Sequence, residues 1–360
     1  MKILMFSNCS GGLYTFRADL IRKMQEHGTV VASVPSTGFT EELTEVKCGL
    51  YLTDIDRRGI NPMKDLKLLL RYRQLLRREK PDLVITYTIK PNIYGGMVCR
   101  MQKIPYAVNI TGLGTAFQNR GALRRLVTVL YKTALKKAKV VFFENGENMR
   151  TLLAEGIVAG NQCCLLNGAG VNTEHYALTP YPAEETPVRF LFMGRVMREK
   201  GIEELFEAMT RLHREGWSCT LDVLGGYEEN YAERISECTQ QGWLNYRGYQ
   251  KDVRPYIAES HCFVLPSWHE GMANTNLECA AMGRPVITSN IHGCKEAVLE
   301  NVSGLLCQPK DADSLYEAMK RFLEMRHEER SAMGRAGRKH MEEVFDKKKV
   351  VEQTIKGLGL

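Results

Sequence analysis

The 360-residue sequence contains no hydrophobic run long enough to cross a membrane, no CxxC pair and no low-complexity segment. A membrane-spanning helix needs about 20 consecutive apolar residues, and the apolar start of the chain, MKILMF, is too short for the core of a signal peptide. The eleven cysteines are odd in number and scattered, a pattern typical of a reducing cytosol. These absences argue against a membrane-spanning protein, a disulfide framework and a cysteine-bound metal cluster.

Charge is present in ordinary amount, but it is unevenly distributed. The sequence has 49 Lys and Arg and 42 Asp and Glu, a formal net charge of +7. Residues 1–165 hold 25 basic and 13 acidic residues, a net +12, whereas the remainder holds 24 and 29, a net −5. A basic half favours an anionic partner. We expect a phospholipid surface rather than nucleic acid, because aromatic platforms and groove-reading motifs are lacking.

Short apolar runs alternate with longer amphipathic segments along almost the whole chain. In the first half such runs lie at 2–8, 29–36, 50–55, 82–87, 106–111 and 139–145. In the second half they lie at 188–194, 219–226, 244–249, 262–267, 284–290 and 304–309. Near-continuous apolar strands separated by helices predict parallel sheets that are covered on both faces. The predicted fold class is therefore α/β.

The pattern predicts two doubly wound, Rossmann-like domains facing a central cleft, one over residues 1–168 and one over 169–345. The stretch from Gly168 to Pro187 contains three prolines, which favours an exposed linker. The last segment, about 346–360, is expected to be a closing helix that could cross back to the first domain.

The stretch HEGMANTNLECAAMG, residues 269–283, places Glu270 and Glu278 eight positions apart at the start of a predicted helix. Thr275 and Glu278 have the spacing of a capping box, which is a purely structural interpretation of Glu278. It leaves Glu270 unexplained, because that acid precedes the helix. The loop amides and the helix N-terminus predict an anion site. A ligand that combines phosphate with hydroxyl groups, such as a sugar nucleotide, suits both features.

The stretch GRVMREKGIEEL, residues 194–205, follows a predicted strand and opens the next helix. Arg195 and Lys200 would therefore lie in a strand-to-helix loop at the carboxyl edge of the sheet. Two cations there can neutralise a diphosphate and stabilise the charge that develops when it leaves. For either residue alone, a solvated basic loop is the simpler interpretation. Together with the glutamates at 270 and 278, the pair favours a binding site.

The ordered set G-R…K-G, L-G-G, R-G-Y, P-S-x-x-E-G and G-x-P-V resembles the retaining GT-B glycosyltransferases of family 4, the glycosyl transferases group 1. The similarity runs over the whole chain, and its sharpest motifs lie in the second half. The loop YTIKPNIYG, residues 87–95, also resembles that of the hexosaminyltransferases that extend lipid-diphosphate-linked oligosaccharides.

The resemblance implies a role for each motif residue. Arg195 and Lys200 would grip the donor diphosphate, Glu270 would approach hydroxyls of the donor sugar, and Glu278 would bind the ribose. The other donor-binding candidates are Gly194, Gly225, Gly226, Tyr249, Gly271, Met272, Ala273, Asn274 and Thr275. The family retains anomeric configuration, and its leaving phosphate helps to deprotonate the acceptor. A covalent glycosyl–Glu intermediate is the rival route.

The first domain is expected to bind the acceptor. Its candidate loop residues are Gly11 and Gly12, which open the first helix, Lys90 and Asn92, and Thr111 and Gly112. The first loop is not a G-x-G-x-x-G fingerprint, so a dehydrogenase-type dinucleotide fold is disfavoured. Many relatives have a His-Gly pair where this chain has Thr111, so no histidine is predicted to be catalytic.

Asp54 and Asp56 form a D-x-D pair, a motif that holds a metal in transferases with a single GT-A domain. In a two-domain chain we prefer the interpretation that they are solvated acids beside Arg57 and Arg58. No metal and no cofactor is expected, and a UDP-sugar is expected as co-substrate.

The predicted helix at 61–80 has a basic face. At 100° per residue, Lys64, Lys67, Arg71 and Arg78 fall within about 60° of one another. An apolar face lies beside them, formed by Leu68, Leu69, Tyr72, Leu75 and Leu76. The basic face is either ordinary solvated surface over a core stripe or a surface that attracts anionic lipid. The segment 119–139 repeats the composition, so we expect a peripheral protein on the cytoplasmic face of the inner membrane.

The sequence therefore predicts a retaining hexosyl- or hexosaminyltransferase. It would move a sugar from a nucleotide sugar, expected to be UDP-linked, to a lipid-linked saccharide acceptor in bacterial surface polysaccharide or glycan biosynthesis. One alternative is an isomerase similar to UDP-N-acetylglucosamine 2-epimerase, which needs no acceptor. Another is a catalytically inactive module that binds sugar nucleotides, which the presence of Arg195, Lys200 and Glu270 disfavours.

Overall fold

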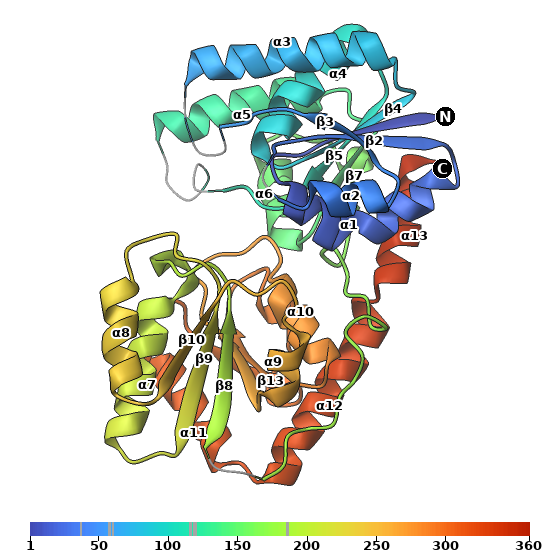
Figure 1. Cartoon of the computed structure of the whole chain (residues 1–360). Helices are drawn as coiled ribbons and strands as arrows, with labels where there is room; N and C mark the ends of the chain where they lie inside the picture. The colour runs from blue at the N-terminus through green and yellow to red at the C-terminus, as the bar shows by residue number, and fades with distance from the viewer. Residues whose placement is uncertain (37, 57–58, 60, 115–116, 118–120, 185–186) are drawn as a thin grey trace. The chain divides into compact units, whose positions relative to one another are not determined.

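The computed structural model describes all residues except 37, 57–58, 60, 115–116, 118–120 and 185–186. The chain divides into two units, Met1–Ala169 with Lys348–Leu360, and Gly170–Lys347 (Figure 1). The division falls next to the boundary expected at residue 168, and it assigns the last thirteen residues to the first unit. Each unit is a parallel sheet with helices on both faces, as the alternating apolar runs predict.

The first unit has a seven-stranded sheet in the order β3-β2-β1-β4-β5-β6-β7, with every pair parallel. The strands are β1 Lys2–Phe6, β2 Thr29–Val34, β3 Gly49–Leu52, β4 Leu83–Tyr87, β5 Tyr106–Ile110, β6 Val140–Phe143 and β7 Cys163–Leu165. The six predicted strands are confirmed, and β7 was not predicted. It has only three residues at the sheet edge, none of them buried, so it lacks the apolar run of a central strand.

Helices cover both faces of this sheet. They are α1 Ser10–Gln25, α2 Thr40–Glu45, α3 Pro62–Glu79, the π-helical turn η1 Pro91–Gly95, α4 Gly96–Gln102, α5 Ala122–Leu135, α6 Gly146–Ala154, the 3₁₀ turn η3 Gly160–Gln162 and α13 Lys347–Leu358. Helices α3, α4 and α5 enclose one apolar core, and α1, α2 and α13 enclose the opposite one. The closing helix therefore packs on the first unit, where it buries Val350, Ile355 and Leu358.

Helix α3 has the core stripe that its periodicity predicts. Leu68, Tyr72 and Leu76 are buried in the first of these cores, and Leu69 and Leu75 pack against it half-buried. The helix begins where the Asn61 side chain accepts hydrogen bonds from two backbone amides of the first turn. Among the described residues, no helix has both the length and the apolar character needed to span a bilayer.

The second unit has a six-stranded parallel sheet in the order β10-β9-β8-β11-β12-β13. The strands are β8 Val188–Met193, β9 Cys219–Leu224, β10 Leu244–Gly248, β11 Cys262–Leu265, β12 Val286–Ser289 and β13 Gly304–Cys307. The helices are η4 Arg198–Lys200, α7 Ile202–Arg214, α8 Ala232–Gln240, α9 Arg254–Glu259, α10 Asn274–Ala281, η5 Lys295–Ala297, α11 Ala312–Glu324 and α12 His327–Val344. All six predicted strands are confirmed.

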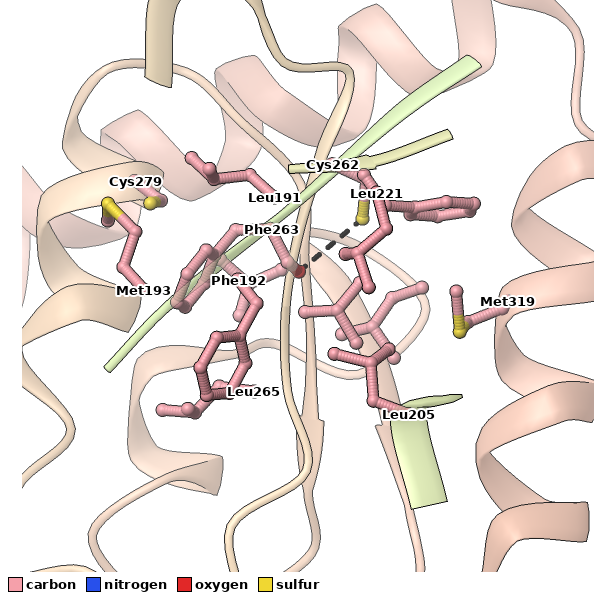
Figure 2. Close-up of a cluster of buried hydrophobic side chains, with 14 of the residues drawn as sticks. Leu191, Phe192, Met193, Leu205, Leu221, Cys262, Phe263, Leu265, Cys279 and Met319 are labelled. Atoms are coloured by element: carbon pink, nitrogen blue, oxygen red, sulfur yellow. Dashed lines mark hydrogen bonds between the residues drawn. The ribbon is translucent and has the colours of Figure 1, made fainter. Parts of the chain in front are cut away.

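The core of the second unit is built on its central strands. Figure 2 shows buried side chains from the sheet, Leu191, Phe192, Met193, Leu221, Cys262, Phe263 and Leu265, with Leu205, Cys279 and Met319 from the surrounding helices. Burial of such large apolar side chains contributes roughly 1.5–3 kcal/mol each. This packing holds the ends of β8 and β11 in place, and it therefore fixes where the loops after these strands begin.

The stretch expected to be an exposed linker is tied to the second unit. Arg284 is fully buried and donates hydrogen bonds to the carbonyls of Thr179 and Pro180, at 3.3 and 2.8 Å, and to that of Ala258 at 2.7 Å. Burial lowers the pKa of this guanidinium to about 10. Most described residues of 172–187 are exposed or half-buried, as expected of a linker, but Arg284 fastens Thr179 and Pro180 to the second unit. The sequence did not predict this attachment, because a lone arginine gives no sign that it is buried.

In both sheets the strand order reverses beside the first strand, between β1 and β4 in one unit and between β8 and β11 in the other. Doubly wound sheets bind ligands outside the carboxyl ends of their strands at such a reversal. The segments after β8 and β11 carry Arg195, Lys200 and Glu270. The segments after β1 and β4 carry the candidates Gly11, Gly12, Lys90 and Asn92 of the first half.

Candidate functional site

A glycine joins the two loops at the reversal point of the second sheet. Gly201 follows η4 with a φ of +73°, and a Cβ at this position would lie 2.1 Å from the carbonyl oxygen of Pro266. A side chain would break this contact between the β8 and β11 loops, and the left-handed backbone also favours glycine. The K-G pair of the motif thus has a structural cause: the glycine lets the loop that carries Lys200 approach the loop that carries Glu270.

A second glycine joins the loops after β8 and β9. A Cβ on Gly225 would lie 1.8 Å from the carbonyl oxygen of Gly194. The Val196 amide donates to Gly226 at 2.9 Å, and the Glu228 amide donates back to the Val196 carbonyl at 3.1 Å. Three predicted donor-binding glycines, Gly194, Gly225 and Gly226, therefore lie where the two loops meet.

The two predicted cations lie on this joined pair of loops, and each contacts a carboxylate. Arg195 Nη1 lies 3.3 Å from Glu228 Oε2, with side-chain exposures of 40% and 31%. Lys200 forms an ion pair with Glu270, with side-chain exposures of 20% and 13%. The Ser267 hydroxyl donates to the same Glu270 oxygen at 2.8 Å. The structure thus brings together Lys200 and Glu270, which are 70 positions apart in the sequence.

The amides of the loop before α10 are only partly available to a ligand. The Ala273 amide donates to the carbonyl of Gly293 at 2.7 Å, and the Asn274 amide donates to Met272 at 3.0 Å. These two amides of the predicted donor-binding stretch, residues 271–274, therefore already have partners within the protein. Thr275 lies half-buried in the first turn of the helix.

Glu278 does not cap its helix. The N-cap of α10 is Ala273, so Glu278 lies inside the helix, and the predicted capping box with Thr275 is wrong. The residue is 8% exposed, and the Tyr176 hydroxyl donates a hydrogen bond to its carboxylate. Burial raises the pKa of Glu278 to about 7, although Tyr176 and Lys347 oppose the shift. A buried carboxyl that titrates near neutrality is typical of a functional site.

Aromatic residues cluster beside the joined loops. Tyr249 follows β10 and is exposed. The rings of Tyr227 and Tyr246 stack at 4.9 Å, and the Tyr246 hydroxyl donates to the Gly225 carbonyl at 2.8 Å. Sequence reasoning missed Tyr227, Tyr246 and Glu228, although two of them directly follow the L-G-G motif.

Trp268 is another residue that sequence reasoning missed. Its indole N–H donates to Glu204 Oε1 of α7 at 3.0 Å, and its amide donates to the Glu199 carbonyl at 3.0 Å. The guanidinium of Arg198 and the ammonium of Lys310 lie over its ring, at 5.4 and 4.6 Å from the centroid. Trp268 therefore fastens the P-S-W-H-E-G loop to the segment that carries Lys200.

In the first unit, the glycine-rich loop is tightly packed. Gly11 and Gly12 lie in the first turn of α1, where the Gly12 amide donates to Cys9 Sγ at 3.3 Å. A Cβ on Gly11 would lie 3.0 Å from the ring of Phe39. Thr111 and Gly112 follow β5 and are half-buried.

Lys90 and Asn92 are held by the protein itself. Lys90 Nζ lies 2.7 Å from Asp65 Oδ1, and the Tyr94 hydroxyl donates to the other oxygen of Asp65 at 2.9 Å. Asn92 is buried and donates to the carbonyl of Asn109 at 2.9 Å. Burial of Asn92 places this acceptor-loop candidate beneath the surface, where its side chain holds the backbone of β5.

A buried ion pair near the carboxyl edge of the first sheet joins Arg17 of α1 to Glu144, which follows β6. The two side chains are 6% and 5% exposed, and the Arg17 guanidinium lies 5.2 Å from the centroid of the Tyr87 ring. Sequence reasoning missed this pair, because 127 positions separate its members and neither belongs to a motif.

The D-x-D pair has contacts of its own. Asp56 Oδ2 lies 3.1 Å from Lys64 Nζ, and the Gly59 amide donates to Oδ1 at 2.8 Å. These hydrogen bonds hold the pKa of Asp56 below its usual range. Arg57 and Arg58 lie outside the described residues. Within the described ranges, no group of three or more His, Cys, Asp or Glu suited to a metal is found.

The chain has two doubly wound sheets, and the second carries the ion pairs Arg195–Glu228 and Lys200–Glu270 on loops at its carboxyl edge. This arrangement is typical of a GT-B type of chain. The model of the glycosyl transferases group 1 matches residues 179–340, and that of the glycosyl transferase 4-like proteins matches residues 2–145. The two matches together span both units, and the chain belongs to the glycosyl transferases group 1, with the 4-like model covering its first half.

Curated relatives cover most of the chain. It is 25% identical over 341 residues, 90% of both chains, to the N,N'-diacetylbacillosaminyl-diphospho-undecaprenol alpha-1,3-N-acetylgalactosaminyltransferase of Campylobacter jejuni. It is 26% identical over 282 residues to the UDP-Gal:alpha-D-GlcNAc-diphosphoundecaprenol alpha-1,3-galactosyltransferase of Escherichia coli, with 73% of this chain and 72% of that protein covered.

Solved structures share the fold. The Anabaena protein HepE, crystallised with UDP and glucose, superposes with a TM-score of 0.82 at 16% identity, covering 100% of this chain and 99% of HepE. A glycosyltransferase from Rickettsia africae superposes with a TM-score of 0.80 at 18% identity, covering 99% and 97%. The predicted α/β fold of GT-B type is confirmed.

Proposed function

We propose that this protein transfers a hexose or N-acetylhexosamine from a UDP-sugar to a lipid-diphosphate-linked saccharide, with retention of anomeric configuration. The donor binds the second unit and the acceptor saccharide binds the first. The pathway is the synthesis of a bacterial surface polysaccharide or glycan. The observation that carries the proposal is that Arg195, Lys200 and Glu270 lie together on partly exposed loops at the reversal point of the second sheet.

The chemistry proceeds by charge stabilisation. As the bond between the anomeric carbon and the phosphate breaks, negative charge grows on the leaving diphosphate. Arg195 and Lys200 meet that charge and stabilise the transition state more than the ground state. Glu270, held by Ser267, is placed to accept hydrogen bonds from hydroxyls of the donor sugar, and Glu278 binds the ribose. The leaving phosphate takes the acceptor proton on the same face, so retention needs no protein nucleophile.

Relatives support the substrate classes. The Campylobacter and Escherichia proteins are named for acceptors linked to undecaprenol through a diphosphate, and the latter for a UDP-galactose donor. HepE has been crystallised with UDP-glucose. These names motivate the choice of UDP and of a lipid-diphosphate acceptor for this chain.

The first unit offers a surface for the membrane that holds such an acceptor. Seven exposed large apolar residues lie on α3, α4 and α5, which enclose one core: Met63, Leu66, Leu70, Met101, Leu123, Leu126 and Val129. Exposed basic residues lie among them, including Lys64, Lys67, Arg71, Arg100 and Arg125. Apolar side chains that enter the headgroup region and cations that meet anionic lipid together stabilise interfacial binding.

Vesicle co-sedimentation tests this surface. Wild type should bind phosphatidylglycerol vesicles. Two double variants should bind several-fold less: one combines Lys67→Gln with Arg71→Gln, and the other combines Leu66→Ser with Leu70→Ser. Val302→Ser removes an exposed apolar side chain from the second unit and serves as the control. Equal binding by all four proteins would remove the membrane from the proposal.

Release of UDP measured with and without a lipid-diphosphate-linked acceptor tests the reaction. Transfer requires both substrates, whereas an epimerase turns over the UDP-sugar without an acceptor. Unchanged turnover in Arg195→Ala would contradict the role of that cation. Failure to bind any nucleoside diphosphate would end the proposal.

A further inference from the structure

Glu228 is the contact residue of Arg195 that the proposed reaction leaves without a role. The other carboxylates of the site have assigned roles, Glu270 at the donor sugar and Glu278 at the ribose. Glu228, in contrast, belongs to none of the motifs. Its carboxylate oxygen lies 3.3 Å from the guanidinium that is expected to hold the diphosphate. A donor that binds Arg195 must therefore approach a negative charge already in contact with it.

The position of Glu228 is set by the backbone. Tyr227 and Val196 form a parallel bridge, and the Glu228 amide donates to the Val196 carbonyl at 3.1 Å. The next acid, Glu229, has a different task, because its carboxylate accepts the Arg198 amide at 2.8 Å. The two glutamates thus have different contacts: Glu229 holds the backbone of the loop, and Glu228 contacts the Arg195 guanidinium.

We propose that Glu228 competes with the diphosphate for Arg195 and thereby speeds the release of the nucleoside diphosphate product. This inference rests on the proposed function. After transfer, the product carries its full charge and lies between two cations, so it would leave slowly. A carboxylate that takes Arg195 back stabilises the empty site and lowers the affinity for the product. Both side chains are partly exposed, so they have room to exchange partners.

Calorimetric titration with UDP tests the competition in the full-length protein. Glu228→Gln should lower the Kd of UDP about tenfold, because it removes a charge a few ångströms from the diphosphate. The Kd of uridine, which has no phosphate, should not change. Steady-state turnover should become more sensitive to inhibition by UDP. Glu237→Gln is the matched control, since it removes the same charge from a pair with Arg234 on α8 and should leave all three values unchanged.

Two more variants test the charge of Glu228 and its dependence on Arg195. Glu228→Asp keeps the charge and should bind UDP much more weakly than Glu228→Gln does. In an Arg195→Ala background, Glu228→Gln should lower the Kd of UDP by a clearly smaller factor than in wild type. An undiminished factor would overturn the competition for Arg195 and leave only through-space repulsion.

The failure of this inference differs from that of the proposed function. If wild type binds no nucleoside diphosphate, the proposed function is wrong. If wild type binds UDP and Glu228→Gln binds it no more tightly, with an unchanged circular dichroism spectrum, only the role of Glu228 is wrong.

Discussion

The two sheets have the same strand order around their reversal points, yet the ion pairs at their carboxyl edges differ in how far they are exposed to solvent. The first unit buries Arg17 against Glu144, with both side chains about 5% exposed. The second unit leaves Arg195 and Lys200 exposed by 40% and 20%, each beside a carboxylate. A cation at the edge of a doubly wound sheet is therefore not by itself a binding residue.

Exposure distinguishes the two roles. A buried ion pair has lost its water, so removing one partner strands a charge, and the pair is structural. A partly exposed pair is weak, because water and salt compete with it. A diphosphate can therefore displace the carboxylates in the second unit, whereas no ligand can easily separate Arg17 from Glu144.

The largest effect on stability is expected where the first unit buries its pair. Glu144→Ala should lower the free energy of unfolding by about 3–5 kcal/mol, because it leaves the Arg17 charge buried without its partner. Urea denaturation measures this. Arg234→Ala breaks a surface pair and should cost under about 1 kcal/mol. If Glu144→Ala and Arg234→Ala lose equal stability, burial does not make the Arg17–Glu144 pair stronger than a surface ion pair.

The largest effect on activity is expected at the second edge. Lys200→Ala should lower kcat/KM by roughly 100- to 1000-fold, since one preorganised partner of the developing charge is lost. Its free energy of unfolding should fall by about 1–2 kcal/mol, less than in Glu144→Ala, because the pair is more exposed and Ser267 still donates to Glu270. Lys320→Ala, which breaks a pair on α11, is the control and should keep full activity. If Lys200→Ala is destabilised as strongly as Glu144→Ala, the Lys200–Glu270 pair is structural in the same way as the Arg17–Glu144 pair.

Glu278 challenges the comparison, because it is buried and yet is expected to bind donor. Its pKa is raised from 4.5 to about 7, so the folded state holds the proton that the unfolded state has lost. Stability should therefore fall as pH rises from about 4.5 to about 7, by roughly 3 kcal/mol, and level off above that range. Urea denaturation across this range should show the slope in wild type and a smaller slope in Glu278→Gln. Parallel curves for the two proteins would contradict the shift.

Lys90 tests the comparison at a burial similar to that of Lys200, since Lys90 and Asp65 are 13% and 15% exposed and Lys200 and Glu270 are 20% and 13% exposed. If the Lys90–Asp65 pair serves only to hold the fold, Lys90→Met should lower the free energy of unfolding by about 1 kcal/mol. The KM for the acceptor should then change less than threefold. A large rise in that KM with little loss of stability would instead return Lys90 to the acceptor site, where the sequence had placed it.

Sequence reasoning located the central strands and the reversal-point loops because both leave local signals. Buried parallel strands are continuous apolar runs, and close approaches such as that of Gly201 to Pro266 require glycine. It missed β7, which is short and lies at the edge, and it read a capping box at Glu278 from spacing alone. It also missed Arg17, Arg284 and Trp268, whose contacts lie far away in the sequence.

The sequence by itself determined the two α/β units, the order of their strands along the chain and the motif residues that end those strands. These follow from local periodicity and from the few backbone positions that only glycine can occupy. The tertiary structure decided which charges are buried and which meet solvent. That outcome depends on packing between distant segments, and it makes Arg17 a structural residue and Arg195 and Lys200 available to a ligand.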